Sequence, residues 1–244
     1  MDVVLDTNIF RSDILLRSRD FEILLDYLMK TESSIKLPQV IFDEILGVYK
    51  RTLKDRYSEL EKTVRNINLS ITDVEKQISL PIVEIEEEVD SYSKYIKKKL
   101  KIHDRQIIPY NNDYLPEISH RLIDRTKPAN EKGHGFRDTL IWLTIKEICQ
   151  KSHEKQVIFI SENSGDFTDS TKNNLSESLI AECQKDGVRI NYYRTIKDFI
   201  DQHSKKIDLI DDKWVAENLD IQSISDLAMD DLNNFEKRGI LSWF

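Results

Sequence analysis

The stretch Val3-Val4-Leu5-Asp6-Thr7-Asn8 indicates the fold of this 244-residue chain. Its apolar residues show no polar alternation, which is typical of a strand covered on both faces in a parallel sheet. Sites in such sheets lie just beyond the carboxyl ends of the strands. Asp6 is therefore well placed for chemistry, although the same position also suits a cap for a helix that begins near Ile9.

Further stretches continue an alternation of strands and helices. Residues 157–161 are predicted to form a second apolar strand, and residues 188–192 another, followed by a helix over 196–203. Residues 35–38 are predicted to form one short strand that a proline ends. This order predicts an α/β fold in which helices cover both faces of an open parallel sheet.

A charged segment separates the two halves of this pattern. Residues 51–126 are dense in Lys and Glu and poor in apolar runs, so we expect a helical insertion that projects from the core. Its basic cluster at 94–101 is either a solvated helical face or a surface that helps to hold a phosphate backbone. The expected organisation is a domain over 1–204, with the insertion, and a helical C-terminal extension over 205–244.

Composition restricts the class of protein only in part. The net charge of −8 argues weakly against broad, salt-driven binding of nucleic acid, but clustered acids in a metal-dependent nuclease would also lower the total. No apolar stretch approaches the roughly 20 residues that cross a bilayer, and no basic segment precedes an apolar leader. The two cysteines are too few for a disulfide framework. We expect a reduced, cytoplasmic setting without a membrane.

Four acids have neighbours that are unusual for a solvated surface. Asp6 follows the first strand, and Glu44 lies on a helix face whose neighbours one turn away are apolar or glycine. Asp138 opens a buried helix after a loop with two glycines, and Asp166 lies in the turn that leaves the second apolar strand. Each has a structural alternative, since Asp138 also suits a helix cap and Asp166 an Asx-turn.

One edge of a parallel sheet can gather all of these acids. Carboxylates in close proximity repel each other unless a cation lies between them, and an all-oxygen site suits Mg²⁺ or Mn²⁺. Such an ion can activate a water and stabilise the charge that develops on a phosphodiester. We expect the acids to be its ligands, directly or through water. The supporting side chains would be Asn8, Ser161 and Asn163.

The ordered set of motifs resembles the PIN-domain nucleases. It consists of a strand with Asp6-Thr7-Asn8, a helix with Glu44, the helix start Arg137-Asp138-Thr139-Leu140-Ile141-Trp142, and Ser161-Glu162-Asn163-Ser164-Gly165-Asp166-Phe167 after a strand. The loop over 132–138 and the long insertion are similar to one subgroup of large bacterial PIN-like proteins. The resemblance covers residues 1–60 and 130–200, and the insertion and tail contribute no matching motif.

The resemblance implies a compact three-layer α/β/α fold and a metal-dependent endonuclease, usually for single-stranded RNA, with Mg²⁺ or Mn²⁺ as cofactor. Many relatives have an acid where this chain has Asn163, which leaves open whether Asn163 or Asp166 faces the metal. Lys132 and Arg137 flank the acids. They either contact a substrate phosphate or pair with the carboxylates and lower their pKa values. The catalytic and metal-ligating set that carries over is Asp6, Glu44, Asp138 and Asp166.

Two hypotheses from different classes follow. The first is a ribonuclease for single-stranded or structured RNA that acts as a toxin or phage-defence effector, with an antitoxin or defence-system protein and a second copy of the chain as candidate partners. The alternative is a catalytically silent PIN-like scaffold that binds RNA or protein. A haloacid-dehalogenase-like phosphatase is disfavoured, because Asn8 stands where such enzymes need a second Asp. No P-loop sequence is present.

Overall fold

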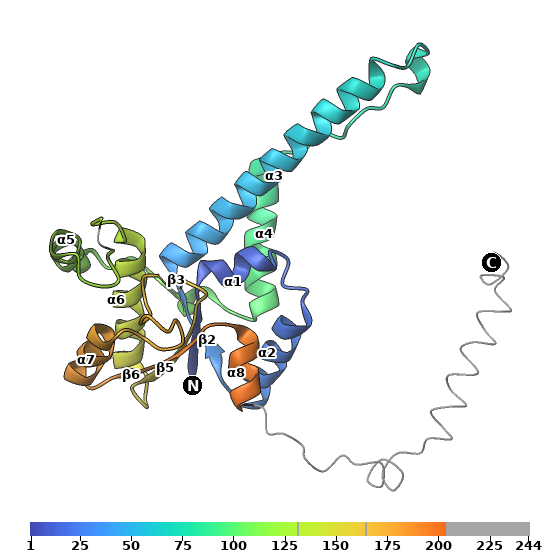
Figure 1. Cartoon of the computed structure of the whole chain (residues 1–244). Coiled ribbons are helices and arrows are strands. Elements are labelled where there is room, and N and C mark those ends of the chain that lie inside the picture. Colours follow the sequence, from blue (N-terminus) through green and yellow to red (C-terminus); the bar gives the residue numbers. More distant parts are fainter. Residues whose placement is uncertain (131, 164, 204–244) are drawn as a thin grey trace, which may run out of the picture. The chain divides into compact units, whose positions relative to one another are not determined.

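The computed structural model describes residues 1–130, 132–163 and 165–203, and its centre is a parallel sheet (Figure 1). The four strands follow the order β2-β1-β5-β6, and Leu5 lies opposite Ile160. All residues of β1 and β5 except the first of each strand are buried, as the unbroken apolar runs predicted. The strands are β1 (Asp2–Leu5), β2 (Ser34–Ile35), β5 (Gln156–Ile160) and β6 (Arg189–Tyr193).

Helices cover both faces of this sheet, which confirms the predicted three-layer α/β/α fold (Figure 1). Helix α6 packs on β1, β5 and β6, and its Trp142 is fully buried. On the other side, Phe199 of α8 makes edge-on ring contacts with Tyr27 of α2 and Tyr193 of β6. The helices are α1 (Thr7–Ser12), α2 (Arg19–Lys30), α3 (Gln39–Asn68), α4 (Ile85–Leu100), α5 (Leu115–Asp124), α6 (Phe136–Lys151), α7 (Glu177–Asp186) and α8 (Ile196–His203).

The prediction of a single strand over residues 35–38 was wrong. The chain forms β2 and then, after Lys36, the separate strand β3 (Leu37–Pro38). The backbone N–H of Lys36 still bonds the carbonyl of Val3, but β3 pairs in parallel with β4 (Ile107–Ile108) in a second, two-stranded sheet. Lys36 is thus the point at which the chain passes from one sheet to the other.

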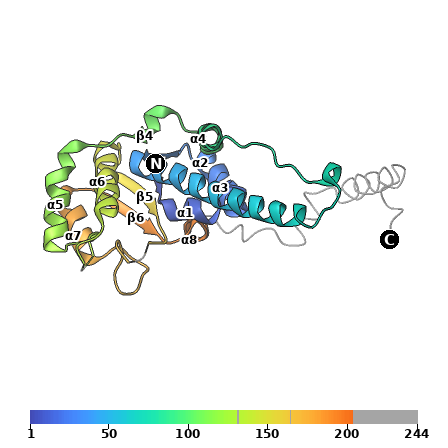
Figure 2. The ribbon, with the colours of Figure 1, turned by 90° about the horizontal axis from the view of Figure 1, so that it is seen from above.

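The charged segment contains both a projecting arm and a part that returns to the core. Helix α3 has 30 residues and extends well beyond the sheet (Figures 1 and 2); at 1.5 Å per residue it is about 45 Å long. Helix α4 returns along its base, where the Tyr92 ring stacks on Tyr49 at 3.9 Å and Ile96 is fully buried. The segment also contains β4 and the short 3₁₀ turns Val74–Lys76, Asp104–Gln106 and Asn112–Tyr114.

The charges of α4 suit a helix that is simply part of the fold. Its first turn is acidic and its last turn contains Lys97, Lys98 and Lys99, which complements the helix dipole. Lys97 pairs with Asp104 at 2.8 Å and lies over the ring of Phe42. These contacts favour the first of the two readings of the basic cluster, a solvated helical face.

Residues 1–202 form one compact unit. The predicted helical extension over 205–244 lies outside the described residues. Within the described part of the chain, no helix combines the length and apolar character needed to cross a membrane.

Candidate active site

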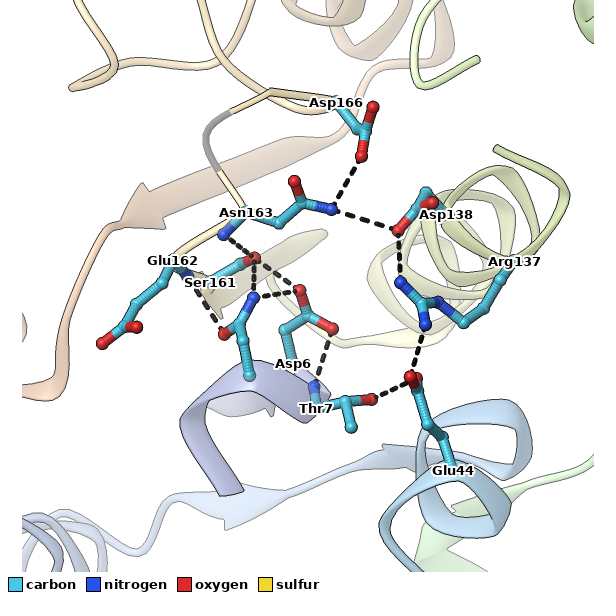
Figure 3. A network of polar contacts seen from close by, with 10 residues as sticks. Asp6, Thr7, Glu44, Arg137, Asp138, Ser161, Glu162, Asn163 and Asp166 are labelled. Carbon is cyan, nitrogen blue, oxygen red and sulfur yellow. Dashed lines mark hydrogen bonds and ion pairs between the residues drawn. The ribbon is translucent and has the colours of Figure 1, made fainter. Parts of the chain in front are cut away.

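The predicted acids meet at the carboxyl edge of the sheet (Figure 3). Asp6 directly follows β1, and Asp166 lies in the loop after β5. Glu44 is in the second turn of α3, and Asp138 is the third residue of α6. Segments up to 160 residues apart in sequence therefore contribute to one group of side chains. This follows from the parallel sheet, because the carboxyl ends of its strands lie at the same edge.

Asp6 serves both as a helix cap and as the buried centre of this group. Its side chain is the N-cap of α1 and accepts the Thr7 N–H at 2.7 Å. It also accepts Nδ2 of Asn8 at 2.8 Å and the Ser161 hydroxyl at 2.5 Å. Burial raises the pKa of Asp6 to about 6; the bonds from Ser161 and Thr7 oppose this rise, and the Asp138 carboxylate adds to it. The site thus holds a carboxylate whose charge is incompletely compensated.

Asp138 is also buried and is not the cap of its helix. Gly135 occupies the N-cap position of α6, so the helix-cap alternative for Asp138 was wrong. Burial raises the pKa of Asp138, and the carboxylate of Asp166 contributes to the rise while Arg137 opposes it. Gly135, three residues earlier, starts this helix with a φ of +123° that residues with a Cβ rarely adopt.

Arg137 bridges two of the acids. Its Nη2 lies 3.4 Å from Oδ1 of Asp138, and its Nη1 bonds Oε1 of Glu44 (Figure 3). The other Glu44 oxygen accepts the Thr7 hydroxyl at 2.7 Å. Pairing with carboxylates is therefore the role of Arg137 in this structure, and 48% of its side chain remains exposed. An acid among apolar neighbours either loses its charge through burial or has a cationic partner, and for Glu44 that partner is Arg137.

Asn163 lies between Asp138 and Asp166. Its Nδ2 is 3.2 Å from Oδ1 of Asp138 and 2.9 Å from Oδ2 of Asp166, and its backbone N–H bonds the Ser161 hydroxyl at 3.0 Å. The amide thus separates the two carboxylates in the structure, and Asp166 is at the outer end of the group (Figure 3).

The contacts close into a ring around the edge of the sheet. In order it runs through Asp6, Thr7, Glu44, Arg137, Asp138, Asn163, Ser161 and back to Asp6. Asn8 supports it by bonding Asp6, Ser161 and the backbone of Glu162. Lys132 does not join it: its side chain is exposed, and its backbone N–H bonds Asn130.

The sequence pattern did not identify two residues that support the site. Thr7, part of the Asp-Thr-Asn triplet, orients Glu44, and that triplet was the available signal. Lys127 donates its amine to the carbonyls of Gly165 at 3.0 Å and Thr168 at 2.6 Å, which holds the loop that carries Asp166. Nothing in the local pattern marks Lys127, because its role depends on a loop forty residues away in the chain.

The donor set fits a hard divalent cation by its chemistry. Among the described residues, no three acidic, histidine or cysteine side chains are arranged as they stand to hold a metal ion. Arg137 contacts the carboxylates of Glu44 and Asp138, and the Asn163 amide lies between those of Asp138 and Asp166. All the candidate ligands are oxygen donors, and the raised pKa values of Asp6 and Asp138 indicate buried acids that a cation would stabilise.

Comparison with known families agrees with this geometry. The sequence profile of the PIN domain matches residues 3–167, more than half of the chain. The chain belongs to the PIN domain family. The match begins in β1 and ends directly after Asp166, so it includes every acid of the site. Searches of curated proteins and of solved structures gave no match. PIN domains are commonly metal-dependent nucleases, and the predicted resemblance is confirmed.

Proposed function

We propose that this PIN-domain protein is an endoribonuclease that depends on Mg²⁺ or Mn²⁺. One observation carries the proposal: acids from distant segments converge in a closed network in which Asp6 and Asp138 are buried and have raised pKa values. A stable fold gains nothing from such unfavourable burial of charge, whereas functional sites commonly contain it.

The side chains of the site have two roles, to hold the ion and to orient its ligands. Asp6, Glu44, Asp138 and Asp166 would hold the ion, directly or through water. When bound, a divalent ion lowers the pKa of its water and stabilises the charge that develops on the phosphodiester. Ser161 and Asn8 fix the orientation of Asp6, Thr7 fixes Glu44, and Asn163 fixes Asp138 and Asp166.

Arg137 and Lys132 are the candidate contacts for the substrate phosphate. The Arg137 guanidinium lies at the acids and is half exposed, so it can reach a phosphate oxygen as well as a carboxylate. Lys132 is exposed in the loop before α6. We extend the proposal to a cytoplasmic toxin or phage-defence role, restrained by an antitoxin or defence-system partner, as the setting in which such a ribonuclease would act.

Glu44→Gln is expected to lower RNA cleavage at least about a hundredfold, because it removes a charge that neighbouring groups are built to orient. The measurement is the cleavage rate of a labelled single-stranded RNA with Mg²⁺ or Mn²⁺ in excess over the protein. Asp43→Asn is the matched control, since Asp43 is the exposed neighbour on the same helix and bonds Gln39 and Tyr110.

The comparison separates the proposal from its alternative. Loss of cleavage in Glu44→Gln with cleavage retained in Asp43→Asn supports the nuclease. Equal cleavage by the two variants rejects the assigned site. A wild-type protein that binds RNA but neither cleaves it nor binds a divalent ion would be the silent scaffold.

A further inference from the structure

A hollow of about 490 Å³ lies between the end of α1 and the base of α3. Asp6 caps the start of α1, and the hollow is at its other end, where Arg11 and Ser12 line it. The α3 side contributes Tyr49, Thr52 and Arg56. Its volume falls within the range of roughly 300–1,000 Å³ that is usual for binding sites of small organic molecules. A hollow of this volume can hold a nucleotide.

Three arginines line the hollow. Arg11, Arg17 and Arg56 line it and are all exposed. Across residues 1–130, 132–163 and 165–203, none of their side chains has an ion pair or hydrogen bond, whereas Arg121 and Arg137 pair with carboxylates. In a protein with a net charge of −8, three arginines that line one hollow thus have no acidic partner among the described residues.

The one acid of the hollow is engaged by the backbone. The carboxylate of Asp13 accepts the N–H groups of Arg17 at 3.0 Å and Ser18 at 2.7 Å, so it closes a turn rather than pairing with an arginine side chain. The lining therefore combines a positive rim with apolar side chains, among them Ile14 and Leu53.

The wall of the hollow is held in place by the inserted segment. Tyr92 of α4 donates its hydroxyl to the carbonyl of Ile14 at 2.6 Å, and Tyr95 donates to the carbonyl of Leu15 at 2.6 Å. Tyr92 also stacks on Tyr49, which lines the hollow. Helices α1, α3 and α4 lie side by side here (Figures 1 and 2). The loop after α1 is thus fixed before any ligand arrives, which lowers the entropic cost of binding.

The hollow lies within reach of a strand held at the acids. Six residues of α1 separate Asp6 from its far end, about 9 Å, and eight residues of α3 separate Glu44 from Thr52, about 12 Å. A few nucleotides of an extended strand cover such distances. The arginines are therefore placed to contact the strand to one side of the phosphate at the acids.

We propose that this hollow binds the RNA nucleotides that flank the scissile bond on one side. The inference rests on the proposed ribonuclease function. Guanidinium groups bind phosphate oxygens in a fork geometry, and an apolar floor suits the face of a base. The occupant is RNA by charge complementarity: the chain is acidic as a whole, yet the lining of this hollow carries three arginines that have no ion pair within the part of the chain that the structure describes.

The test compares two double variants with equal loss of charge. Arg11→Gln/Arg56→Gln removes two arginines of the hollow. Arg65→Gln/Arg105→Gln removes two exposed arginines elsewhere, of which Arg65 lies nine residues beyond Arg56 on α3, about half a turn out of phase and so on the other face of that helix. Binding of a fluorescent single-stranded RNA is measured by anisotropy in EDTA, where no cleavage occurs, over a series of salt concentrations.

The hollow variant is expected to weaken binding at least about tenfold and to reduce the salt slope by about 0.7 for each lost phosphate contact. With divalent ion added, its loss of kcat/KM lies in KM rather than in kcat. The control double variant matches the wild type.

The other results separate this proposal from the nuclease assignment. Equal binding by the two double variants, with RNA still cleaved by the wild type, overturns the proposal that the hollow binds RNA and leaves the nuclease assignment intact. RNA binding that depends on Arg11 and Arg56 without any cleavage supports the hollow and rejects the nuclease. Displacement of the RNA by a polyglutamate peptide of equal charge and concentration overturns the proposal in favour of an acidic peptide.

Discussion

Asp6→Asn is expected to reduce RNA cleavage by about 10²–10³-fold or more, because Asp6 is the acid around which the site is built. The side chain keeps its size and an oxygen that accepts the Thr7 N–H, whereas the amide nitrogen that replaces Oδ2 no longer accepts Nδ2 of Asn8. The measurement is the single-turnover cleavage rate with Mg²⁺ or Mn²⁺. Asp26→Asn is the control, since the Asp26 carboxylate is exposed and pairs only with Lys30 within the described residues.

The same substitution is expected to stabilise the metal-free protein at neutral pH. A carboxyl whose folded pKa is raised from 3.8 to about 6 favours the folded state when protonated, and this stability is lost as pH rises through that window. Asparagine has no charge to bury. The variant should therefore gain up to about 3 kcal/mol over the wild type at pH 7 and close to nothing at pH 3.

Urea unfolding in EDTA at a series of pH values measures this difference. The account requires the gap between Asp6→Asn and the wild type to widen from pH 4 to pH 7, and added Mn²⁺ to stabilise the wild type alone. A gap between the two proteins that stays constant from pH 4 to pH 7 would show that Asp6 is a structural cap and not a strained site acid.

Gly135→Ala is expected to damage both stability and activity. A Cβ at Gly135 would lie 2.9 Å from Cα of Ala129 and 3.1 Å from the carbonyl oxygen of Pro128, and the backbone φ of +123° is itself unfavourable for alanine. These neighbours are backbone atoms that cannot move independently. The start of α6 must therefore shift, and with it Arg137 and Asp138. We expect a loss of about 2 to 4 kcal/mol in unfolding free energy.

Gly187→Ala is the matched control for this experiment. Gly187 has a φ of +64° at the end of α7, and its added Cβ meets nothing within 4 Å. That change measures the cost of the positive φ alone, about 1 kcal/mol. Cleavage should fall in Gly135→Ala and remain in Gly187→Ala. Equal losses of stability in the two variants would mean that the close approach at Gly135 has no role.

The fold and the site acids could be predicted where neighbouring residues in the sequence show a clear pattern of apolar and polar side chains. The unbroken apolar runs of β1 and β5 predicted a parallel sheet with covered faces, and the sheet placed Asp6 and Asp166 at one edge. The apolar neighbours of Glu44 on its helix face marked that residue as unusual, and in the structure it bonds Arg137 and Thr7.

What remained unpredictable depends on tertiary partners that local spacing does not specify. The break at Lys36 reflects the presence of β4, seventy residues later, as a partner for β3. The charged composition of α4 gave no sign that Tyr92 would stack on Tyr49 of α3 or that Ile96 would be fully buried. Lys127 resembles any loop lysine until its carbonyl partners after β5 are known.

Titration calorimetry with Mn²⁺ at pH 7 tests the central claim most directly, because it asks whether the acids bind a divalent ion irrespective of the RNA. The wild type is expected to bind Mn²⁺, and Asp138→Asn to bind it at least about tenfold more weakly, since Asp138 is a buried carboxylate in contact with Arg137 and Asn163. Equal Mn²⁺ affinity of the two proteins, or no binding by the wild type, would contradict the account.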